Sequence, residues 1–434
     1  MQTDFLPHLL ADPDTALAEK ILRKCVHCGF CTATCPTFLE LGDELDSPRG
    51  RIWLIKDMLE TGRPADPETV THLDRCLTCL ACTTTCPSGV DYMHLVDHAR
   101  AHVARTHTRP ILDRLMRTML SLVVPRPRLF RLALHAAALA RPLAPWLPKR
   151  FAPFFALAPA RLPAPSPVDR PQTFAAAAPR RRRVALLSGC AQTVLDTAIN
   201  EATVRLLTRL GVEVVVAKGT GCCGALDHHM GEVDRAHTLA ARNVRAWAAE
   251  IDGAGLDAIV VTTSGCGTTV KDYGHLFRHD ARLAADAARV AGLARDVSEV
   301  LADLDLVGRL VPGPRPRVVY HSACSMQHGQ KITTLPADLL ARAGFPVTSP
   351  AESHVCCGSA GTYNILQPEL AGRLRDRKVG HLAATGAEVV AAGNIGCMVQ
   401  IATGTATPIV HTVELLDWAT GGPAPHGLEA FTRP

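Results

Sequence analysis

The sequence predicts an α-helical domain followed by two duplicated α/β domains, a fold class written here as α+α/β. Three features of the 434-residue chain lead to this prediction. Two cysteine runs of identical spacing flank a helical segment near the N-terminus, strand-like apolar segments alternate with amphipathic helices after residue 183, and a Cys-Cys-Gly triplet occurs twice. We therefore expect four segments, at residues 1–105, 106–183, 184–310 and 311–434.

The cysteine content and the N-terminus limit the class of protein. The chain has sixteen cysteines. Its start carries four acidic residues and no basic stretch before an apolar run, so we expect no secretory signal and a cytoplasmic location. In that reducing compartment, cysteines favour metal or redox chemistry over a disulfide framework.

The two cysteine runs, CVHCGFCTATCP (25–36) and CLTCLACTTTCP (76–87), share the spacing CxxCxxCxxxCP. Bacterial two-cluster ferredoxins have this spacing, and in them the fourth cysteine of each run ligates the other cluster. We therefore predict two 4Fe-4S clusters with crossed ligands. One cluster has the ligands Cys25, Cys28, Cys31 and Cys86, and the other has Cys76, Cys79, Cys82 and Cys35.

A pair of zinc knuckles is the alternative for these runs, because CxxC pairs also bind zinc. Zinc, however, has no use for the third CxxC step or for the trailing Cys-Pro. His27 lies inside the first run, and we interpret it as a loop residue because the cysteines already complete both clusters.

A helix is predicted between the runs, within LDSPRGRIWLIKDMLETG (45–62). Ser47 is a suitable N-cap before Pro48, Gly62 ends the pattern, and the apolar face contains Ile52, Ile55 and Leu59. Arg49 and Arg51 are expected to solvate the helix start or to steer an anionic partner. The helical spacer resembles the α-helical ferredoxin module of succinate dehydrogenase iron-sulfur subunits rather than the compact βαβ ferredoxin.

Basic residues are concentrated in residues 100–183. This segment contains seventeen Arg or Lys and only two acidic residues, Asp113 and Asp169. The apolar stretches there are broken by proline and are too short to span a bilayer. One interpretation is contact with a membrane surface, with these aromatic residues at the boundary: Phe130, Trp146, Phe151, Phe154 and Phe155. The other is a Pro-rich linker with a helix docked on a partner subunit. Nucleic-acid binding is not expected, because no reading helix accompanies the charge.

The α/β pattern begins after residue 183. VALLSGC (184–190) and LDAIVVTTSGC (256–266) predict buried parallel strands, and VEVVVAKGTGCCG (212–224) lies between them. Ligands of open α/β sheets bind outside the carboxyl ends of the strands. The cysteines at these ends should therefore converge on one site, made of Cys190, Cys222, Cys223 and Cys266.

A second copy follows at a nearly constant offset. Its cysteines are Cys324, Cys356, Cys357 and Cys397, which follow the first set by 134, 134, 134 and 131 residues. This is an internal duplication, and we predict that its cysteines also bind metal, either an iron-sulfur cluster or zinc. Gly224 and Gly358 are expected to let the backbone approach a metal closely. Buried structural thiols are the alternative.

These motifs resemble the glycolate oxidase iron-sulfur subunit family over nearly the whole chain, and least in the middle segment. The stretches that carry the resemblance are CVHCGFCTATCP, GDELDSPRGRI, HLDRCLTC, TTCPSGV, SGCG, CCGSAGTY and NIGC. Lactate-utilisation, anaerobic glycerol-3-phosphate and heterodisulfide reductase proteins share the CCG plan. The heterodisulfide type often has a further CxxC cysteine, whereas here Cys266 precedes Gly-Thr-Thr and Cys397 precedes Met-Val-Gln. This departure argues against a non-cubane, disulfide-reducing cluster.

The resemblance implies an electron-transfer subunit. Such a subunit accepts electrons from FAD-binding partners that oxidise glycolate to glyoxylate and passes them toward a membrane quinone, from the inner face of the cell membrane. The chain has no GxGxxG fingerprint and no nucleophile elbow, so we expect no catalytic residue on it. The alternatives are the iron-sulfur subunit of a lactate or glycerol-3-phosphate dehydrogenase, a heterodisulfide-reductase-like catalytic subunit, and a zinc-bound scaffold.

Overall fold

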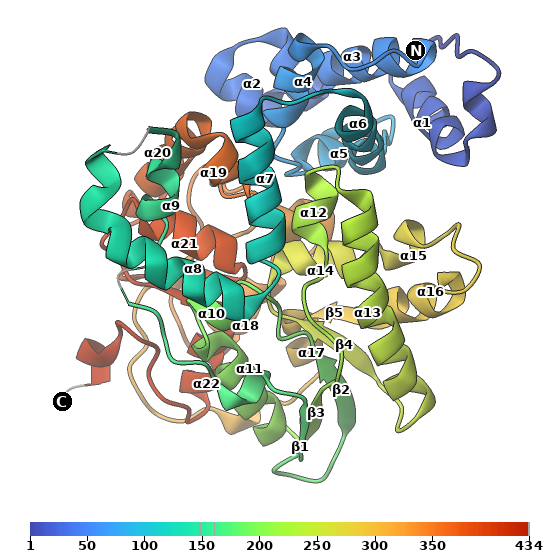
Figure 1. The fold of residues 1–434 in the computed structure, drawn as a ribbon. Coiled ribbons are helices and arrows are strands. Elements are labelled where there is room, and N and C mark those ends of the chain that lie inside the picture. Colours follow the sequence, from blue (N-terminus) through green and yellow to red (C-terminus); the bar gives the residue numbers. More distant parts are fainter. Residues whose placement is uncertain (147–148, 160, 433–434) are drawn as a thin grey trace.

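The computed structural model describes residues 1–146, 149–159 and 161–432. A helical N-terminal domain lies against two α/β domains, and helix α7 runs from it toward α8, which lies across the α/β part (Figure 1). The predicted fold class is confirmed. The N-terminal helices are α1 (Pro13–Lys24), α2 (Pro36–Leu41), α3 (Pro48–Thr61), α4 (Pro67–Asp74), α5 (Ala81–Thr85) and α6 (Tyr92–Thr106).

The predicted helix between the cysteine runs is confirmed as α3. The Ser47 side chain accepts a hydrogen bond from the Gly50 backbone N–H at 3.0 Å, which satisfies one of the free donors at the helix start. Gly62 ends the helix in the left-handed conformation, with φ 65°. The predicted apolar face is buried, since Ile52, Ile55 and Leu59 are each at most 3% exposed.

Two sheets form the α/β part. The first has the strand order β1-β3-β2-β4-β5 and the second has the order β7-β6-β8-β9. Apart from β1, which pairs antiparallel with β3, the described pairings are parallel. Without β1 the two orders are equivalent, which confirms the predicted duplication. The strands are β1 (Gln172–Phe174), β2 (Arg182–Leu186), β3 (Val212–Val216), β4 (Ala258–Val261), β5 (Ala294–Asp296), β6 (Val318–His321), β7 (Val347–Thr348), β8 (Val389–Ala392) and β9 (Ile409–His411).

Helices pack on both sheets and link their strands. The first α/β domain contains α10 (Gln192–Leu195), α11 (Ala198–Arg209), α12 (Ala225–His229), α13 (Val233–Asp252), α14 (Ser264–Lys271), α15 (Tyr273–Leu276), α16 (Ala284–Leu293) and α17 (Val297–Ala302). The second contains α18 (Leu335–Arg342), α19 (Tyr363–Leu366), α20 (Pro368–Ala383), α21 (Ile395–Ala402) and α22 (Thr412–Ala419). The middle segment forms α7 (Ile111–Val123), α8 (Pro127–Ala140) and α9 (Ala152–Ala156).

The two α/β domains share one hydrophobic core, which runs from Val184 on β2 to Trp418 on α22. Their cysteine-bearing edges also face each other. The Ser264 backbone N–H donates to the Gly393 carbonyl at 3.1 Å, and the hydroxyl oxygens of Ser264 and Ser325 are 2.6 Å apart. The loops at the carboxyl ends of the two sheets therefore meet at one interface.

An ionised histidine joins the N-terminal domain to the first α/β domain. His94 on α6 contacts Asp91 at 2.6 Å and Asp272 at 3.0 Å. Burial alone would lower its pKa, but the hydrogen bonds and charges of Asp272 and Asp91 raise the pKa of His94 to about 10. The charged form of this side chain therefore stabilises the folded protein.

We expect His94→Gln to remove a pH-dependent part of the stability. Because the folded pKa lies above the ordinary value of about 6.5, the contribution is complete below pH 6.5 and is lost as pH rises toward 10. The free energy of unfolding, measured by chemical denaturation at pH 6, 8 and 10, should differ between wild type and variant most at pH 6. The exposed His135→Gln serves as control. A difference that stays constant with pH would contradict the prediction.

Candidate metal centres

The four cysteines expected around one cluster, Cys25, Cys28, Cys31 and Cys86, line a single hollow in the N-terminal domain, and Cys82 of the other expected set also borders it. They meet because α5 packs against the 3-10 turn Phe30–Thr34. The Thr34 and Thr85 hydroxyl oxygens are 3.2 Å apart, so the cysteine that follows each threonine is directed to the other run. His27 lines the same hollow, in a left-handed loop conformation with φ 55°.

The other four cysteines form a second, more buried group. An Arg51 N–H contacts Cys35 Sγ at 3.8 Å, and the Arg51 charge also acts on Cys76. Burial raises the pKa of Cys82 well above its usual value, and the neighbouring Cys79, Cys76 and Cys35 contribute. Thiolates in such a place need a positive counter-charge, which iron supplies. The donor set therefore fits a cluster, and crossed ligation remains a prediction.

Arg51 contradicts the expectation that it lies exposed at the helix start, because its side chain is only 2% exposed. It pairs with Asp46 at 3.1 Å and donates to the Thr37 hydroxyl at 3.0 Å. Asp46 is fully buried and also pairs with Arg75 at 2.9 Å. A buried guanidinium requires such partners, and the nearby SPRGR pattern gave no sign of them.

The cysteines of the first α/β domain converge at the carboxyl edge of its sheet, as predicted. Cys190 follows β2, Cys222 and Cys223 follow β3, and Cys266 lies in the first turn of α14 after β4. Cys190 lies beside Cys222, and Cys223 lies beside Cys266. The loop is held by Asn243, which donates to the Cys222 carbonyl at 3.0 Å, and by Tyr273, which donates to the Cys223 carbonyl at 2.9 Å.

The glycine of each CCG triplet lies against the backbone of a neighbouring helix. Gly224 and Gly358 have φ of 88° and 84°, and a Cβ on them would lie 2.8 Å and 2.5 Å from the carbonyl oxygens of Ala236 and Ala371. Both glycines are therefore required where the loop passes a helix backbone, on α13 and α20, and close approach of the backbone to a metal remains a prediction. This contact fixes the position of the preceding cysteines.

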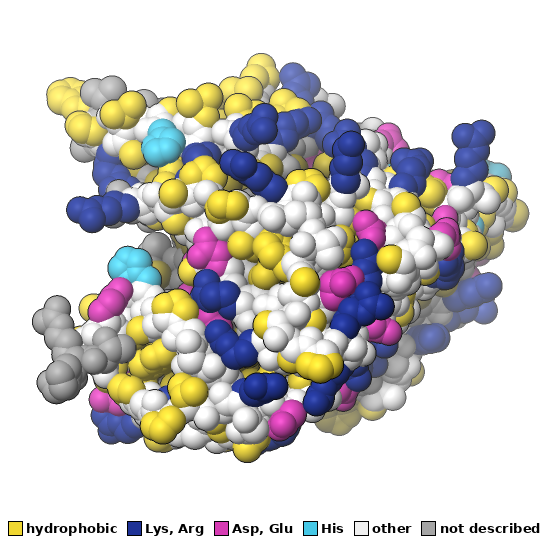
Figure 2. Space-filling view, turned by 90° about the horizontal axis from the view of Figure 1, so that it is seen from below, with side chains coloured by type: hydrophobic (Ala, Val, Ile, Leu, Met, Phe, Trp, Pro, Cys, Tyr) yellow, Lys and Arg dark blue, Asp and Glu magenta, His cyan; other side chains and the backbone are white. Residues whose placement is uncertain are grey.

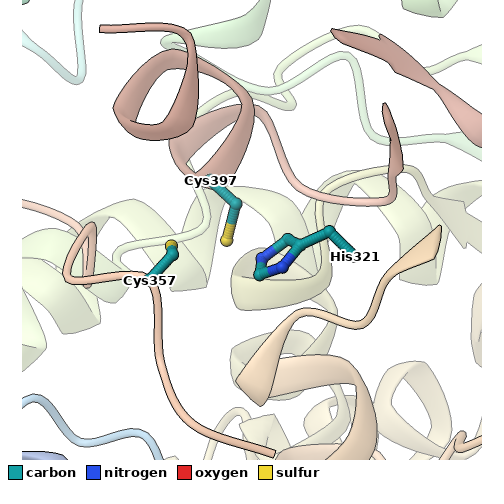
Figure 3. A group of neighbouring side chains, drawn as sticks. All are labelled: His321, Cys357 and Cys397. Carbon is teal, nitrogen blue, oxygen red and sulfur yellow. The ribbon is translucent and has the colours of Figure 1, made fainter. Parts of the chain in front are cut away.

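The second α/β domain repeats the arrangement with one change. The Sγ atoms of Cys324 and Cys356 are 3.8 Å apart, and Cys357 lies beside Cys397. Asn394 donates to Cys397 Sγ at 3.2 Å. His321, at the end of β6, lies close to the last two cysteines (Figure 3). His321 was not among the predicted site residues, although it stands three residues before Cys324 in VVYHSAC.

Both cysteine sets open onto one cavity of about 650 Å³. Seven of the eight CCG cysteines line it: Cys190, Cys222, Cys223, Cys266, Cys324, Cys356 and Cys397. Four aromatic residues that were expected at a membrane boundary, Phe130, Phe151, Phe154 and Phe155, line this cavity instead. They turn inward because α8 and α9 cover the apolar opening. Trp146 alone of the five is exposed, at 86%.

The N-terminal domain touches the second α/β domain through a cluster loop. Cys79 packs in one hydrophobic core with Cys356 and Val355, and Cys324 borders the same core. The Thr84 hydroxyl and the His328 ring nitrogen are 2.8 Å apart across this contact. The second cysteine group of the N-terminal domain is therefore adjacent to the second CCG site.

Comparisons with known proteins agree with this geometry. Residues 21–90 match the 4Fe-4S dicluster domain family, and residues 184–271 and 318–402 match the cysteine-rich domain family CCG. The chain is 42% identical over 96% of its length, and 99% of the relative's, to the "Glycolate oxidase iron-sulfur subunit" of Escherichia coli (strain K12). It is 32% identical to the "Probable glycolate oxidase iron-sulfur subunit" of Bacillus subtilis (strain 168), over 89% of each chain. "Lactate utilization protein A" of Geobacillus kaustophilus is 27% identical over 54% of this chain and 98% of its own.

The fold and the cysteine sets define an iron-sulfur electron-transfer protein with a dicluster domain and two CCG domains. More particularly, the chain belongs to the glycolate oxidase iron-sulfur subunit family. Members of this family are subunits of an oxidoreductase, which agrees with the expectation that this chain has no substrate-oxidising site of its own.

Proposed function

We propose that the chain relays electrons from FAD-binding partner subunits, which oxidise glycolate to glyoxylate, toward a membrane quinone. The observation that carries this proposal is that Cys79 and Cys356 lie in one hydrophobic core. It supports a continuous path from the exposed Cys28, through the two cysteine groups of the N-terminal domain, to the CCG cavity. Iron-sulfur clusters bound at these cysteines supply one-electron chemistry.

Electron entry is proposed at the hollow around Cys28. Val26 and Phe30 line this hollow and are 66% and 64% exposed, which is unusual for large apolar side chains in a group. Arg49 lies at the same hollow beside Glu44. An apolar centre with a charged rim is typical of a protein interface, and we assign it to a flavin-containing subunit.

Electron exit is proposed on the side of the CCG cavity that α7–α9 cover. The cavity is lined mostly by apolar and aromatic side chains, among them Phe130, Phe154 and Leu134. Such a lining suits a lipid-soluble aromatic carrier. We further propose that the first CCG domain binds an additional iron-sulfur cluster at Cys190, Cys222, Cys223 and Cys266.

The outer face of α7 and α8 supports a peripheral position on the membrane. Its exposed apolar side chains include Ile111, Leu115, Leu132 and Leu139, at 77%, 60%, 64% and 84%. Hydrophobic and basic side chains lie next to each other at the upper left of Figure 2, where the α8 region is seen. The described helices contain none with the length and hydropathy needed to cross a bilayer.

Some of the arginines of residues 100–183 form ion pairs within the protein. Arg109 and Arg117 both pair with Asp74 and Asp113, at 2.6–3.3 Å. These arginines hold α7 to the N-terminal domain, so fewer than the fifteen excess charges of residues 100–183 remain for a membrane. The exposed Arg114, Arg126 and Arg128 are the basic residues that we assign to lipid contact.

We expect the protein to float with anionic vesicles at low salt and to be released at high salt. Leu115→Ser/Leu132→Ser should weaken this binding at every salt concentration, whereas Arg114→Gln/Arg128→Gln should weaken it mainly at low salt. Flotation with neutral vesicles separates the two contributions. Equal recovery of wild type and both double variants would rule out direct contact of this face with lipid.

The relay itself is tested in the complex formed with its flavin-containing partners. Glycolate should reduce the iron-sulfur clusters, as observed by electron paramagnetic resonance. Lactate should reduce them only if lactate is the donor. Cys79→Ser should preserve reduction of the flavin but stop quinone reduction, while Thr84→Ser, in the same loop, should preserve both. Quinone reduction at the wild-type rate in Cys79→Ser would refute the proposed path.

A further inference from the structure

His321 is a buried histidine of the second α/β domain that forms no hydrogen bond with any residue the structure describes. Its side chain is 1% exposed at the end of β6. Among the described residues, neither Nδ1 nor Nε2 has a hydrogen-bond partner. A buried polar atom left without a partner destabilises the folded protein, so a ring with two such atoms requires an explanation.

Two cysteine thiols beside the His321 ring explain its unpaired nitrogens. A ring nitrogen of His321, Cys357 Sγ and Cys397 Sγ all lie within 4.8 Å of one another. Figure 3 shows the ring and the two sulfur atoms converging from three separate segments: β6, the CCG loop and the start of α21. Each of these segments follows or ends a strand of the second sheet, so the sheet itself brings the three donors together.

The three donors lie near the spacing that a single ion requires. Zinc binds cysteine sulfur at about 2.3 Å and histidine nitrogen at about 2.0 Å, so donors on one ion lie at most about 4.6 Å apart. Mixed nitrogen and sulfur ligands are the set that zinc prefers.

The first domain lacks this arrangement. The residue 134 positions before His321 is Leu187, which is buried in the apolar core beside β2. Cys223, the equivalent of Cys357, lines the shared cavity, whereas Cys357 is not among the residues that line it. The two CCG domains are therefore duplicated in fold but differ in their donor atoms.

We propose that His321, Cys357 and Cys397 bind one zinc-type divalent ion, so that the second CCG domain has a metal centre different from that of the first. The remaining thiols of this domain, Cys324 and Cys356, face the cavity and the Cys79 loop. Zinc is not redox-active, and its role here is to fix the carboxyl ends of β6 and β8 beside the electron path. The proposal is independent of the electron donor.

The test uses the full-length protein purified under anaerobic conditions. Zinc K-edge X-ray absorption of the wild type should show sulfur and nitrogen neighbours, with about one zinc per chain by metal analysis. His321→Leu, which reproduces the first domain, should weaken zinc binding by about tenfold or more. His321→Cys should retain zinc with an all-sulfur shell, and the exposed His135→Leu is the matched control.

Three outcomes would overturn the proposal. Wild-type protein with iron but no zinc at this domain would do so, as would a zinc shell that contains sulfur alone. Unchanged zinc content in His321→Leu would exclude His321 as a ligand. The wild-type spectrum decides the matter even if a variant does not fold. None of these readouts depends on glycolate or quinone, so failure of the electron relay and failure of the zinc site are distinguishable.

Discussion

The double variant Cys25→Ser/Cys35→Ser should lose both clusters of the dicluster domain, whereas Cys25→Ser/Cys86→Ser should lose one. With crossed ligands, Cys25 and Cys35 belong to different clusters, and Cys25 and Cys86 belong to the same one. Cys86 shares a hollow with Cys25, Cys28 and Cys31, which Cys82 also borders. Cys35 lies outside this hollow, beside Arg51, and this separation of Cys35 from the rest of its run supports the grouping. The effect is large because a cubane that lacks one thiolate is exposed to loss of iron.

Iron analysis and electron paramagnetic resonance of the reduced proteins give the readout. Relative to the wild type, Cys25→Ser/Cys35→Ser should lose about eight irons and Cys25→Ser/Cys86→Ser about four. Each single variant should lose about four, and Thr34→Ser, beside Cys35, is the control. The reverse order of the two double variants would show that each run ligates its own cluster.

Arg51→Met should destabilise the dicluster domain by about 3 kcal/mol. The change removes Arg51, the α3 cation that pairs with the buried Asp46 carboxylate. Breaking a buried ion pair by removal of one partner is costly. Arg75 and His72 remain beside Asp46 and limit the loss. Removal of the positive charge next to Cys35 should also make the reduction potential of the adjacent cluster more negative.

The matched control is Arg49→Met, two positions earlier on the same helix. Arg49 pairs with Glu44 on a partly exposed surface, so its loss should change the free energy of unfolding little. Denaturant unfolding and potentiometric titration of both variants measure the two effects. Equal stability of Arg51→Met and Arg49→Met would show that the buried pair does not contribute as argued.

Local features of the chain could be predicted from the sequence because they depend on spacing along it. The cap residues Ser47 and Gly62 define α3, and the apolar runs define the strands β2, β4, β6 and β8. A parallel sheet places the ends of its strands at one edge, so convergence of the CCG cysteines also followed from the sequence. The nearly constant offset of 131–134 residues between the two cysteine sets revealed the duplication.

Long-range packing decided the remaining features. Arg51 is buried because Asp46, Thr37 and the Cys35 thiol come together around it, and a pattern of neighbouring residues does not show such partners. The aromatic residues of the middle segment line a cavity because α7–α9 fold back over the two α/β domains, whereas composition shows only that they are apolar.

The cysteine count by itself determined that this protein handles metal, and the two runs determined where a dicluster domain lies. Only the tertiary structure placed Cys79 against the second CCG domain and His321 between two thiols. The physical reason is that a ligand set is defined by distances between side chains from separate strands and loops. Those distances are fixed when the sheets, the CCG glycines and the helices behind them pack together.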